Sequence, residues 1–194
     1  MKRALVLLVS LLALTSLLVG GTSAAVAAPT ATERLPAIEQ ALLVKLNAIR
    51  VARGLRPLVS SSGLQDAAAF HSRTMLQIGF FKHESNDGTP FFVRVKRFYG
   101  ATGYGQWSVG ENLLYSDAEL DAQAMIDAWL ESPAHRRNML SSAWREVGIG
   151  AVYSDAAGGT YGGAPTWMIT MDFGFRILTG SKSQTTLSVT RSTA

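Results

Sequence analysis

The chain has 194 residues, a length that suits one domain with a sizeable core. It has no cysteine, which excludes the disulfide-stapled class of secreted proteins and leaves stability to the packed core. The formal net charge is +4, and without Lys2 and Arg3 there remain 16 basic residues against 14 acidic ones, too small an excess to favour nucleic acid as a partner.

The first 28 residues have the composition of an export signal. Residues 1–3 are basic, residues 4–19 are mostly apolar, and Val26-Ala27-Ala28 satisfies the small-x-small rule for cleavage. We therefore expect residues 1–28 to be a cleavable signal peptide, and the mature protein to be secreted without a stable membrane span. The alternative is a membrane anchor, which the shortness of the apolar run disfavours. Residues 29–35 are predicted to be a polar leader.

Helical spacing of apolar residues predicts a first helix that begins at Pro36 and stops at Gly54. Asn47 and Arg50 share one face of this helix and are expected to brace a neighbouring loop. Residues 56–58 are predicted to be an extended connector.

A second helix is predicted from Ser61 or Ser62, either of which can cap it, to Gly79. Its alanines indicate close packing against another element. His71 lies on a mostly apolar face of this helix, so we expect it to be a buried core residue with its hydrogen bonds satisfied.

His83 is a stronger candidate for a functional residue, because it lies in a polar loop directly after Phe80 and Phe81, which are expected to enter the core. Glu111 is the second candidate. It follows Gly110 and is flanked by apolar residues, so it is expected to be buried and either paired or functional.

Residues 91–98 are predicted to form a short helix or strand. The apolar side chains of Phe91, Phe92, Val95 and Phe98 would share the packed face. Arg94, Lys96 and Arg97 would then point outward as a solvated charge run. Residues 100–110 are predicted to be a loop that leads into a strand.

A third helix is predicted from a cap at Asp117 to the break at Ser132-Pro133. Residues 134–140 would add one or two turns, which carry His135.

Beyond Arg145 the apolar residues alternate, which predicts strands over residues 147–153 and 165–175, joined by a Gly-rich loop. Asp172 would lie on the face opposite Trp167 and Phe173. Helices followed by an antiparallel pair give the α+β class, with helices packed on a small sheet. Residues 181–194 are predicted to be a Ser/Thr-rich tail.

Seven motifs in this order resemble the CAP superfamily (the SCP or pathogenesis-related-1 domain), and most closely its bacterial branch. They are L-N-A-I-R at 46–50, A-A-A-F-H-S at 67–72, F-K-H at 81–83, G-E-N-L at 110–113, W-L-E-S-P-A-H-R-R-N-M-L at 129–140, V-G-I-G at 147–150 and W-M-I-T-M-D-F-G at 167–174. The resemblance implies a CAP domain over residues 36–180. Its expected fold is a three-layer α-β-α sandwich with a small antiparallel sheet between helices.

Matched by motif, the resemblance also implies a cleft lined by His83, Glu111 and His135. The second Glu of the family's His/Glu tetrad corresponds to Ser132 here, and the neighbouring Glu131 lies about 100° round a helix from that position. The tetrad is therefore incomplete.

Two histidines and one carboxylate suit several kinds of site. His83 and His135 could hold zinc, with Glu111 as a third ligand, or could hold an anion when protonated. The same three residues could run acid–base chemistry, or could simply form a polar network that joins loops.

Two functions follow as hypotheses. The first is a secreted binding module that takes up a divalent metal, a lipid, a sterol-like molecule or another cell-envelope ligand. Tyr99, Tyr104, Trp107 and Tyr115 could form the rim of its cleft, although ordinary core and loop packing is the favoured role for any one of them. The second is a metal-dependent or acid–base hydrolase, peptidase-like, that uses Glu111, His83 and His135. The lack of cysteine and of a G-x-S-x-G motif disfavours most covalent mechanisms.

Overall fold

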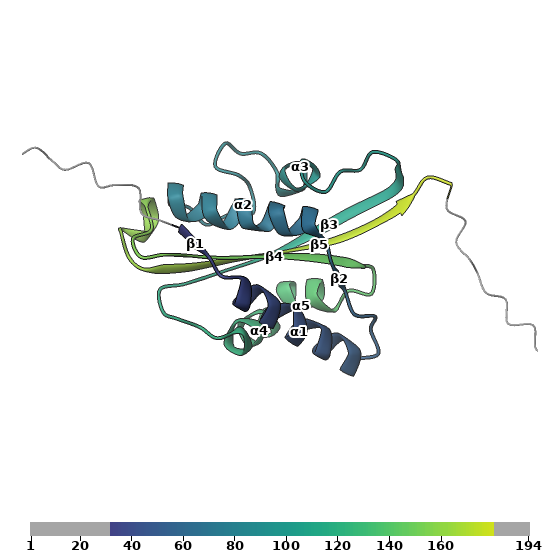
Figure 1. The fold of residues 1–194 in the computed structure, drawn as a ribbon, viewed down its shortest axis with the longest axis horizontal. Helices are drawn as coiled ribbons and strands as arrows, with labels where there is room; N and C mark the ends of the chain where they lie inside the picture. Colours follow the sequence, from purple (N-terminus) through teal and green to yellow (C-terminus); the bar gives the residue numbers. More distant parts are fainter. Residues whose placement is uncertain (1–31, 181–194) are drawn as a thin grey trace, which may run out of the picture.

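The computed structural model describes residues 32–180; the predicted signal peptide, the start of the predicted leader and the predicted tail lie outside this range. The elements in chain order are β1 (Thr32–Arg34), α1 (Pro36–Ala52), β2 (Val59–Ser60), α2 (Ser62–Ile78), α3 (Phe91–Lys96), β3 (Tyr104–Ser116), α4 (Ala122–Glu131), α5 (Pro133–Leu140), β4 (Glu146–Ser154), the short 3-10 helix η1 (Gly159–Tyr161) and β5 (Thr166–Leu178). Helices α2 and α3 cover one face of the sheet, and α1, α4 and α5 cover the other (Figure 1). The predicted α+β class and the α-β-α sandwich are confirmed.

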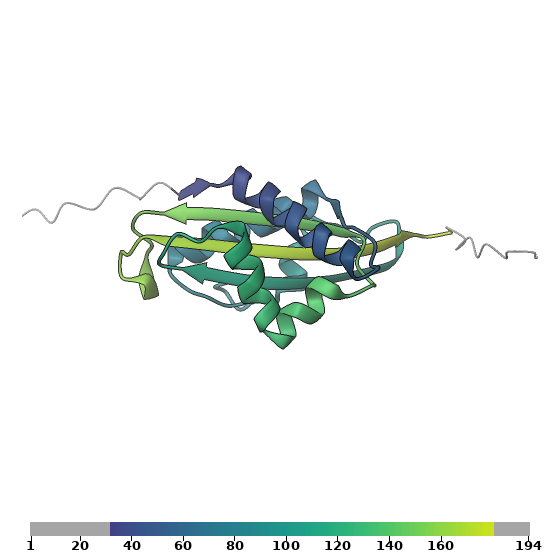
Figure 2. The ribbon, with the colours of Figure 1, turned by 90° about the horizontal axis from the view of Figure 1, so that it is seen from below.

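The sheet has the strand order β1-β4-β5-β3, and the two-residue β2 pairs with the same edge of β4 as β1. All pairs are antiparallel except β2 with β4. Figure 2 shows β5 running between β4 and β3, with α1 and α4 lying across the sheet. In this register Glu111 of β3 lies opposite Asp172 of β5.

Helix α2 lies unusually close to β4, because two glycines of β4 face it. A Cβ atom at Gly148 would lie 2.1 Å from backbone atoms of α2, and one at Gly150 would lie 2.2 Å from the backbone nitrogen of Ala69. The facing residues of α2 are Leu64 and Gln65 at Gly148, and the buried Ala68 and Ala69 at Gly150. The close packing predicted from the alanines is confirmed, and it requires the glycines as well.

The brace predicted for α1 is also present. The side-chain amide of Asn47 exchanges hydrogen bonds of 2.9 and 2.8 Å with the backbone of Leu58. The buried Arg50 guanidinium donates to the carbonyls of Arg56, Met139 and Ser141. These bonds fasten α1 to the connector before β2 and to the end of α5.

Three predicted boundaries differ from the structure. Residues 32–34 of the predicted leader form β1, which pairs with β4. Strand β3 begins at Tyr104, inside the segment predicted as a loop. The N-cap of α4 is Asp121, whose side chain accepts a hydrogen bond from Ala124 at 2.8 Å, whereas Asp117 precedes the helix. Both aspartates suit a cap by composition, and only the geometry of the turn selects one.

No helix among the described residues is long and apolar enough to cross a membrane.

Candidate functional site

Two of the three sequence candidates, His83 and Glu111, are in contact. Glu111 lies on β3 and is buried, and its Oε1 accepts a hydrogen bond of 2.8 Å from Nδ1 of His83. Its Oε2 is bonded to Nη2 of Arg94 in a buried ion pair. Arg94 also donates from Nη1 to the backbone oxygen of His83 at 2.8 Å. Arg94 therefore holds both the carboxylate and the loop that carries the imidazole.

This position of Arg94 contradicts the sequence prediction, which placed it on a solvated face with Lys96 and Arg97. The Arg94 side chain is 1% exposed, whereas Lys96 and Arg97 do face solvent. A helical pattern places charged residues on the solvent side by default. It carries no information about a partner on a distant element, which here is Glu111 on β3. Phe92 and Phe98, predicted to be packed, are exposed instead.

The His83 side chain is 48% exposed at a cleft of about 450 Å³. The lining residues are His83, Glu84, Phe91, Val109, Gly110, Glu111, Asn138 and Trp144. The hydrogen bond to Glu111 raises the pKa of His83. An ionised carboxylate can only accept, so Nδ1 carries hydrogen and Nε2 is the ring atom left for a ligand. When His83 is neutral, Nε2 offers a lone pair to a ligand. When His83 is protonated, Nε2 carries a hydrogen and acts as a donor.

Helix α5 is joined to this site by a chain of amide side chains. Asn138 donates to the backbone oxygen of Glu111 at 3.1 Å and to Oδ1 of Asn112 at 2.9 Å. Asn112 in turn donates to the backbone oxygen of His135 at 3.1 Å. Asn138 thus gives the motif of residues 129–140 its fixed position beside β3.

His135 itself is less closely engaged than the sequence suggested. It is partly buried and is not among the residues that line the His83 cleft. Burial, together with the nearby charge of His83, lowers the pKa of His135. The structure therefore joins His83 to Glu111 directly and brings His135 only within electrostatic reach.

Asp172 is a buried acid beside the site. The sequence pattern placed it on the correct face of its strand but did not identify it as a neighbour of Glu111. Asp172 lies opposite Glu111 across the β3–β5 pair and is fully buried, with the Glu111 carboxylate as its neighbour. Burial and the charge of Glu111 raise the pKa of Asp172 well above its usual value. One buried cation, Arg94, thus faces two acids, an arrangement that favours the neutral form of Asp172. The available sequence signal was an acid in the middle of an apolar strand.

The core role predicted for His71 is confirmed. His71 is 1% exposed, and its Nε2 lies 2.9 Å from the carbonyl oxygen of Lys82. Burial lowers the pKa of His71 to about 4. Its bond to the residue before His83 helps to fix the loop.

The three imidazoles should therefore titrate in the order His83, His135, His71, with His83 above 6.5 and His71 near 4. The contribution of His71 to stability is complete above its unfolded pKa, near 6.5, and is lost as pH falls to about 4. The contribution of His83 has the opposite sign, and is lost as pH rises through its raised pKa. Imidazole NMR titration checks the order, and a His71 that protonates before His83 would contradict it.

His83, Glu111 and His135, the ligands expected for a metal, are arranged in a way that suits metal binding poorly. Both oxygens of Glu111 are bonded, one to His83 and the other to Arg94. Within the described part of the chain, no three His, Cys, Asp or Glu side chains gather as a metal site would need. Glu111 is placed like the carboxylates that do not bind a metal themselves but accept a hydrogen bond from a histidine and fix the orientation of its ring. Zinc at His83 and His135 stays a prediction that rests on the two imidazoles alone.

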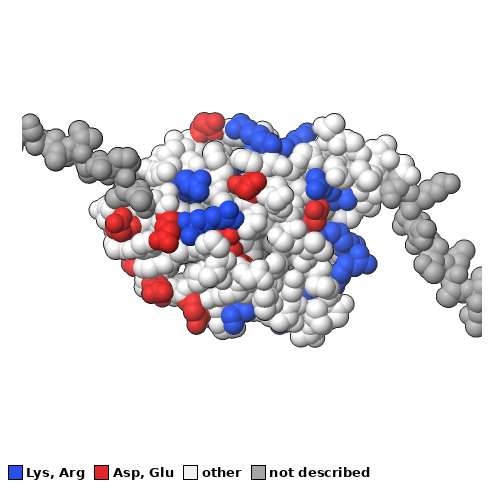
Figure 3. Space-filling view, in the orientation of Figure 1, with Lys and Arg blue, Asp and Glu red and all other residues white. Residues whose placement is uncertain are grey.

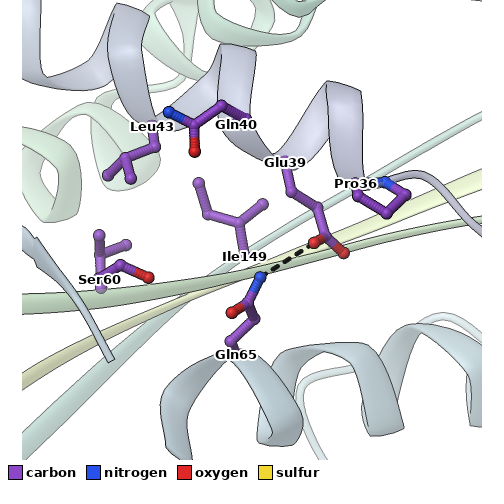
Figure 4. Close-up of a pocket in the computed structure, with 8 residues that line it drawn as sticks. Pro36, Glu39, Gln40, Leu43, Ser60, Gln65 and Ile149 are labelled. Carbon is purple, nitrogen blue, oxygen red and sulfur yellow. Dashed lines mark hydrogen bonds between the residues drawn. The ribbon is translucent and has the colours of Figure 1, made fainter. Parts of the chain in front are cut away.

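A second cavity, of about 210 Å³, lies at the edge of β4 between α1, β2 and α2 (Figure 4). Its acid, Glu39, accepts hydrogen bonds from the side chains of Arg34 and Gln65 and from the backbone nitrogen of Ala151. These bonds leave Glu39 no free charge to offer a ligand. We therefore interpret the cavity as part of the junction between the two helical layers.

The aromatic residues predicted for the rim of the cleft do not line it. Tyr99, Tyr104, Trp107 and Tyr115 are all absent from the lining of the His83 cleft. Tyr99 is buried, and its hydroxyl donates to Glu146. Phe91 and Trp144 supply the aromatic walls instead.

Residues 43–173 match the family described as Cysteine-rich secretory protein family (CAP). Two curated relatives come from Bacillus subtilis (strain 168). The uncharacterized protein YkwD is 29% identical over 126 residues, which are 64% of this chain and 46% of YkwD. The uncharacterized membrane protein YlbC is 30% identical over 112 residues, 58% of this chain and 31% of YlbC. The matched part of the chain spans less than half the length of either relative.

Two solved structures resemble the fold. An outer surface protein from Borrelia burgdorferi gives a TM-score of 0.61 at 15% identity, over 76% of this chain and 100% of that one. An extracellular protein containing a SCP domain from Bacillus anthracis str. Ames gives a TM-score of 0.55 at 25% identity, over 71% of this chain and 40% of that one.

Proposed function

The chain belongs to the cysteine-rich secretory protein (CAP) family, and from this premise we propose that it is an exported binding module whose His83 cleft takes the anionic group of a cell-envelope ligand. The observation that carries the proposal is the half-exposed His83, held from behind by the buried Glu111–Arg94 pair. With Nδ1 occupied, the protonated ring offers its second N–H to the cleft. The extracellular SCP protein from Bacillus anthracis supports a site of action outside the cell.

The walls of the cleft favour an amphiphilic ligand such as a lipid. Phe91 and Trp144 are apolar surfaces beside the His83 imidazole. Pockets of this kind bind through apolar contact and are oriented by a few polar groups. An anionic head at Nε2 of His83 with an alkyl or ring system against Phe91 satisfies both requirements.

Octanoate is a suitable probe, because it joins a carboxylate to a short apolar chain. We expect it to bind more tightly at a pH of about 5.5 than at about 8.5, since only the protonated ring offers a donor. His83→Gln should weaken binding at acidic pH by about tenfold, the value of a charge-assisted hydrogen bond. Calorimetry, or the change in tryptophan fluorescence on binding, measures both effects.

The matched control is Lys82→Gln, which removes a neighbouring positive charge that does not line the cleft. It should change octanoate binding by no more than about twofold. Equal losses in Lys82→Gln and His83→Gln, or binding that does not depend on pH, would contradict the role of His83.

A divalent metal is a second candidate ligand, favoured by the free Nε2 of His83 when the ring is neutral. Zinc titration of the wild-type chain and of His83→Gln and His135→Gln variants decides it. Loss of zinc binding in both variants supports shared coordination, and binding unchanged in both excludes it.

A hydrolase is the less favoured alternative. The His83–Glu111 pair resembles the base and orienting acid of hydrolytic sites. The cleft lining, as far as the described residues form it, contains no hydroxyl or thiol side chain, so water would have to be the nucleophile. Turnover of a peptide substrate that disappears in Glu111→Gln would revive this alternative.

A further inference from the structure

The outer face of α3 carries apolar and basic side chains together. Phe92 is 48% exposed and Val93 is 39% exposed, and Lys96 and Arg97 are also exposed. These four residues are spaced i, i+1, i+4 and i+5, so they share one side of the helix, while Phe91, Arg94 and Val95 face the protein. A solvated helix face does not need two large apolar side chains.

The same surface continues onto α2. Phe98, 39% exposed, follows α3, and its ring centroid lies 5.6 Å from that of Phe70, which is 43% exposed. Arg73 is exposed about one helical turn after Phe70. We call these seven residues the aromatic–basic patch: Phe70, Arg73, Phe92, Val93, Lys96, Arg97 and Phe98.

Four of the eleven exposed large apolar residues described in the protein belong to this patch. Scattered apolar residues need no explanation, but a group of this kind marks an interaction surface. Basic side chains gather along the upper rim, over α3, with acidic side chains farther along the same rim (Figure 3). Asp87 is a nearby acid whose pKa is lowered by hydrogen bonds from Thr89 and, less strongly, by the charge of Arg97; a single carboxylate offsets only part of the positive charge.

We propose that the aromatic–basic patch docks this domain on the surface of an anionic lipid bilayer. Aromatic rings favour the boundary between headgroups and acyl chains, and Lys and Arg favour anionic headgroups. The mixture of three phenylalanines with three basic residues fits this partner better than an all-apolar protein interface or a purely electrostatic one. The cleft lies beside the patch, because Phe91 on the inner side of α3 lines it, with its ring centroid 6.3 Å from that of His83. Docking would therefore place the cleft next to the headgroups, although it needs no ligand in the cleft.

Vesicle flotation tests the proposal. The protein used should begin at Pro29, because the apolar residues 4–19 would enter bilayers by themselves. This shortened protein keeps all three described core clusters, since their residues all follow Pro29. We expect binding to equimolar phosphatidylcholine–phosphatidylglycerol vesicles that weakens with salt, and little binding to phosphatidylcholine alone. Lys96→Glu with Arg97→Glu should weaken partitioning by at least about tenfold, from the known attraction of basic residues near anionic membranes. Phe92→Ser with Val93→Ser should have a similar effect through lost apolar burial.

Matched control pairs lie on α1 and its C-cap. Val44→Ser with Val51→Ser changes two valines that are each 57% exposed, and Lys45→Glu with Arg53→Glu makes the same change of charge. Equal losses in patch and control variants would overturn the proposal, as would equal binding to neutral and anionic vesicles. Wild-type protein that self-associates through the patch and ignores vesicles would identify a protein interface instead.

The cleft and the patch are separable. The patch variants should leave octanoate binding unchanged. Failure of docking therefore leaves the proposed cleft function standing.

Discussion

Replacing Arg94 with methionine is expected to lower the free energy of unfolding by about 3–5 kcal/mol, the cost of breaking a buried ion pair from one side. Arg94 is buried and pairs with the buried Glu111, and it also bonds to the carbonyl oxygen of His83. Asp172 lies on the other side of Glu111 and cannot replace the lost cation. The variant would have to bury the Glu111 carboxylate with only the half-exposed His83 as a side-chain partner, or protonate it. Urea unfolding at neutral pH measures the loss.

Two further variants make this prediction specific. Arg97→Met removes an exposed arginine that directly follows the same helix, and should change stability by no more than about 0.5 kcal/mol. Arg94→Met combined with Glu111→Gln removes both charges, and should recover part of the loss, because no unpaired charge then remains. Equal stabilities for Arg94→Met and Arg97→Met would show that the ion pair is not buried in solution.

Asp172→Asn belongs to the same series. Asparagine has the shape of a protonated aspartic acid, so the change should leave the pKa of His83 in place if Asp172 already carries a proton. A clear fall in that pKa would show instead that Asp172 is ionised, because its negative charge would have been favouring the imidazolium.

Gly150→Ala is expected to destabilise the protein by about 3 kcal/mol or more, as overpacking does where the backbone has to move. The added Cβ would lie 2.2 Å from the backbone nitrogen of Ala69, and a helix backbone cannot rotate away as a side chain can. Helix α2 would have to lift from the sheet. Because the loop of His83 follows α2, octanoate binding should fall together with stability. Thermal unfolding and calorimetry check the two effects.

The control for this substitution is Gly100→Ala. Gly100 has no atom within 4 Å of the position of a Cβ, and its φ is not positive. The change should therefore be neutral within about 0.5 kcal/mol. A Gly150→Ala protein as stable as Gly100→Ala would mean that α2 is not held against β4 at this distance.

The helices and strands were largely predictable because they rest on local periodicity. Apolar residues at helical spacing gave α1 and α2, and alternation beyond Arg145 gave β4 and β5. Thr32–Arg34 was missed, because a three-residue strand has too few positions to show alternation, and its pairing with β4 is a long-range contact. The cap of α4 was misplaced for a related reason, since Asp117 and Asp121 are equivalent by composition.

The residues of the candidate site were likewise predictable only where the signal is local. Local sequence was enough to mark His83 and Glu111 as candidates, because a loop histidine and an acid among apolar residues are unusual. Contacts between distant segments set the rest: the bond between these two residues, the absence of His135 from the lining of their cleft, and the burial of Arg94 and Asp172 around Glu111. The physical reason is that periodicity indicates only which face of a helix or strand is exposed to solvent. A charge turned inward is stable only with a partner from another element, and that partner lies at no fixed distance along the chain.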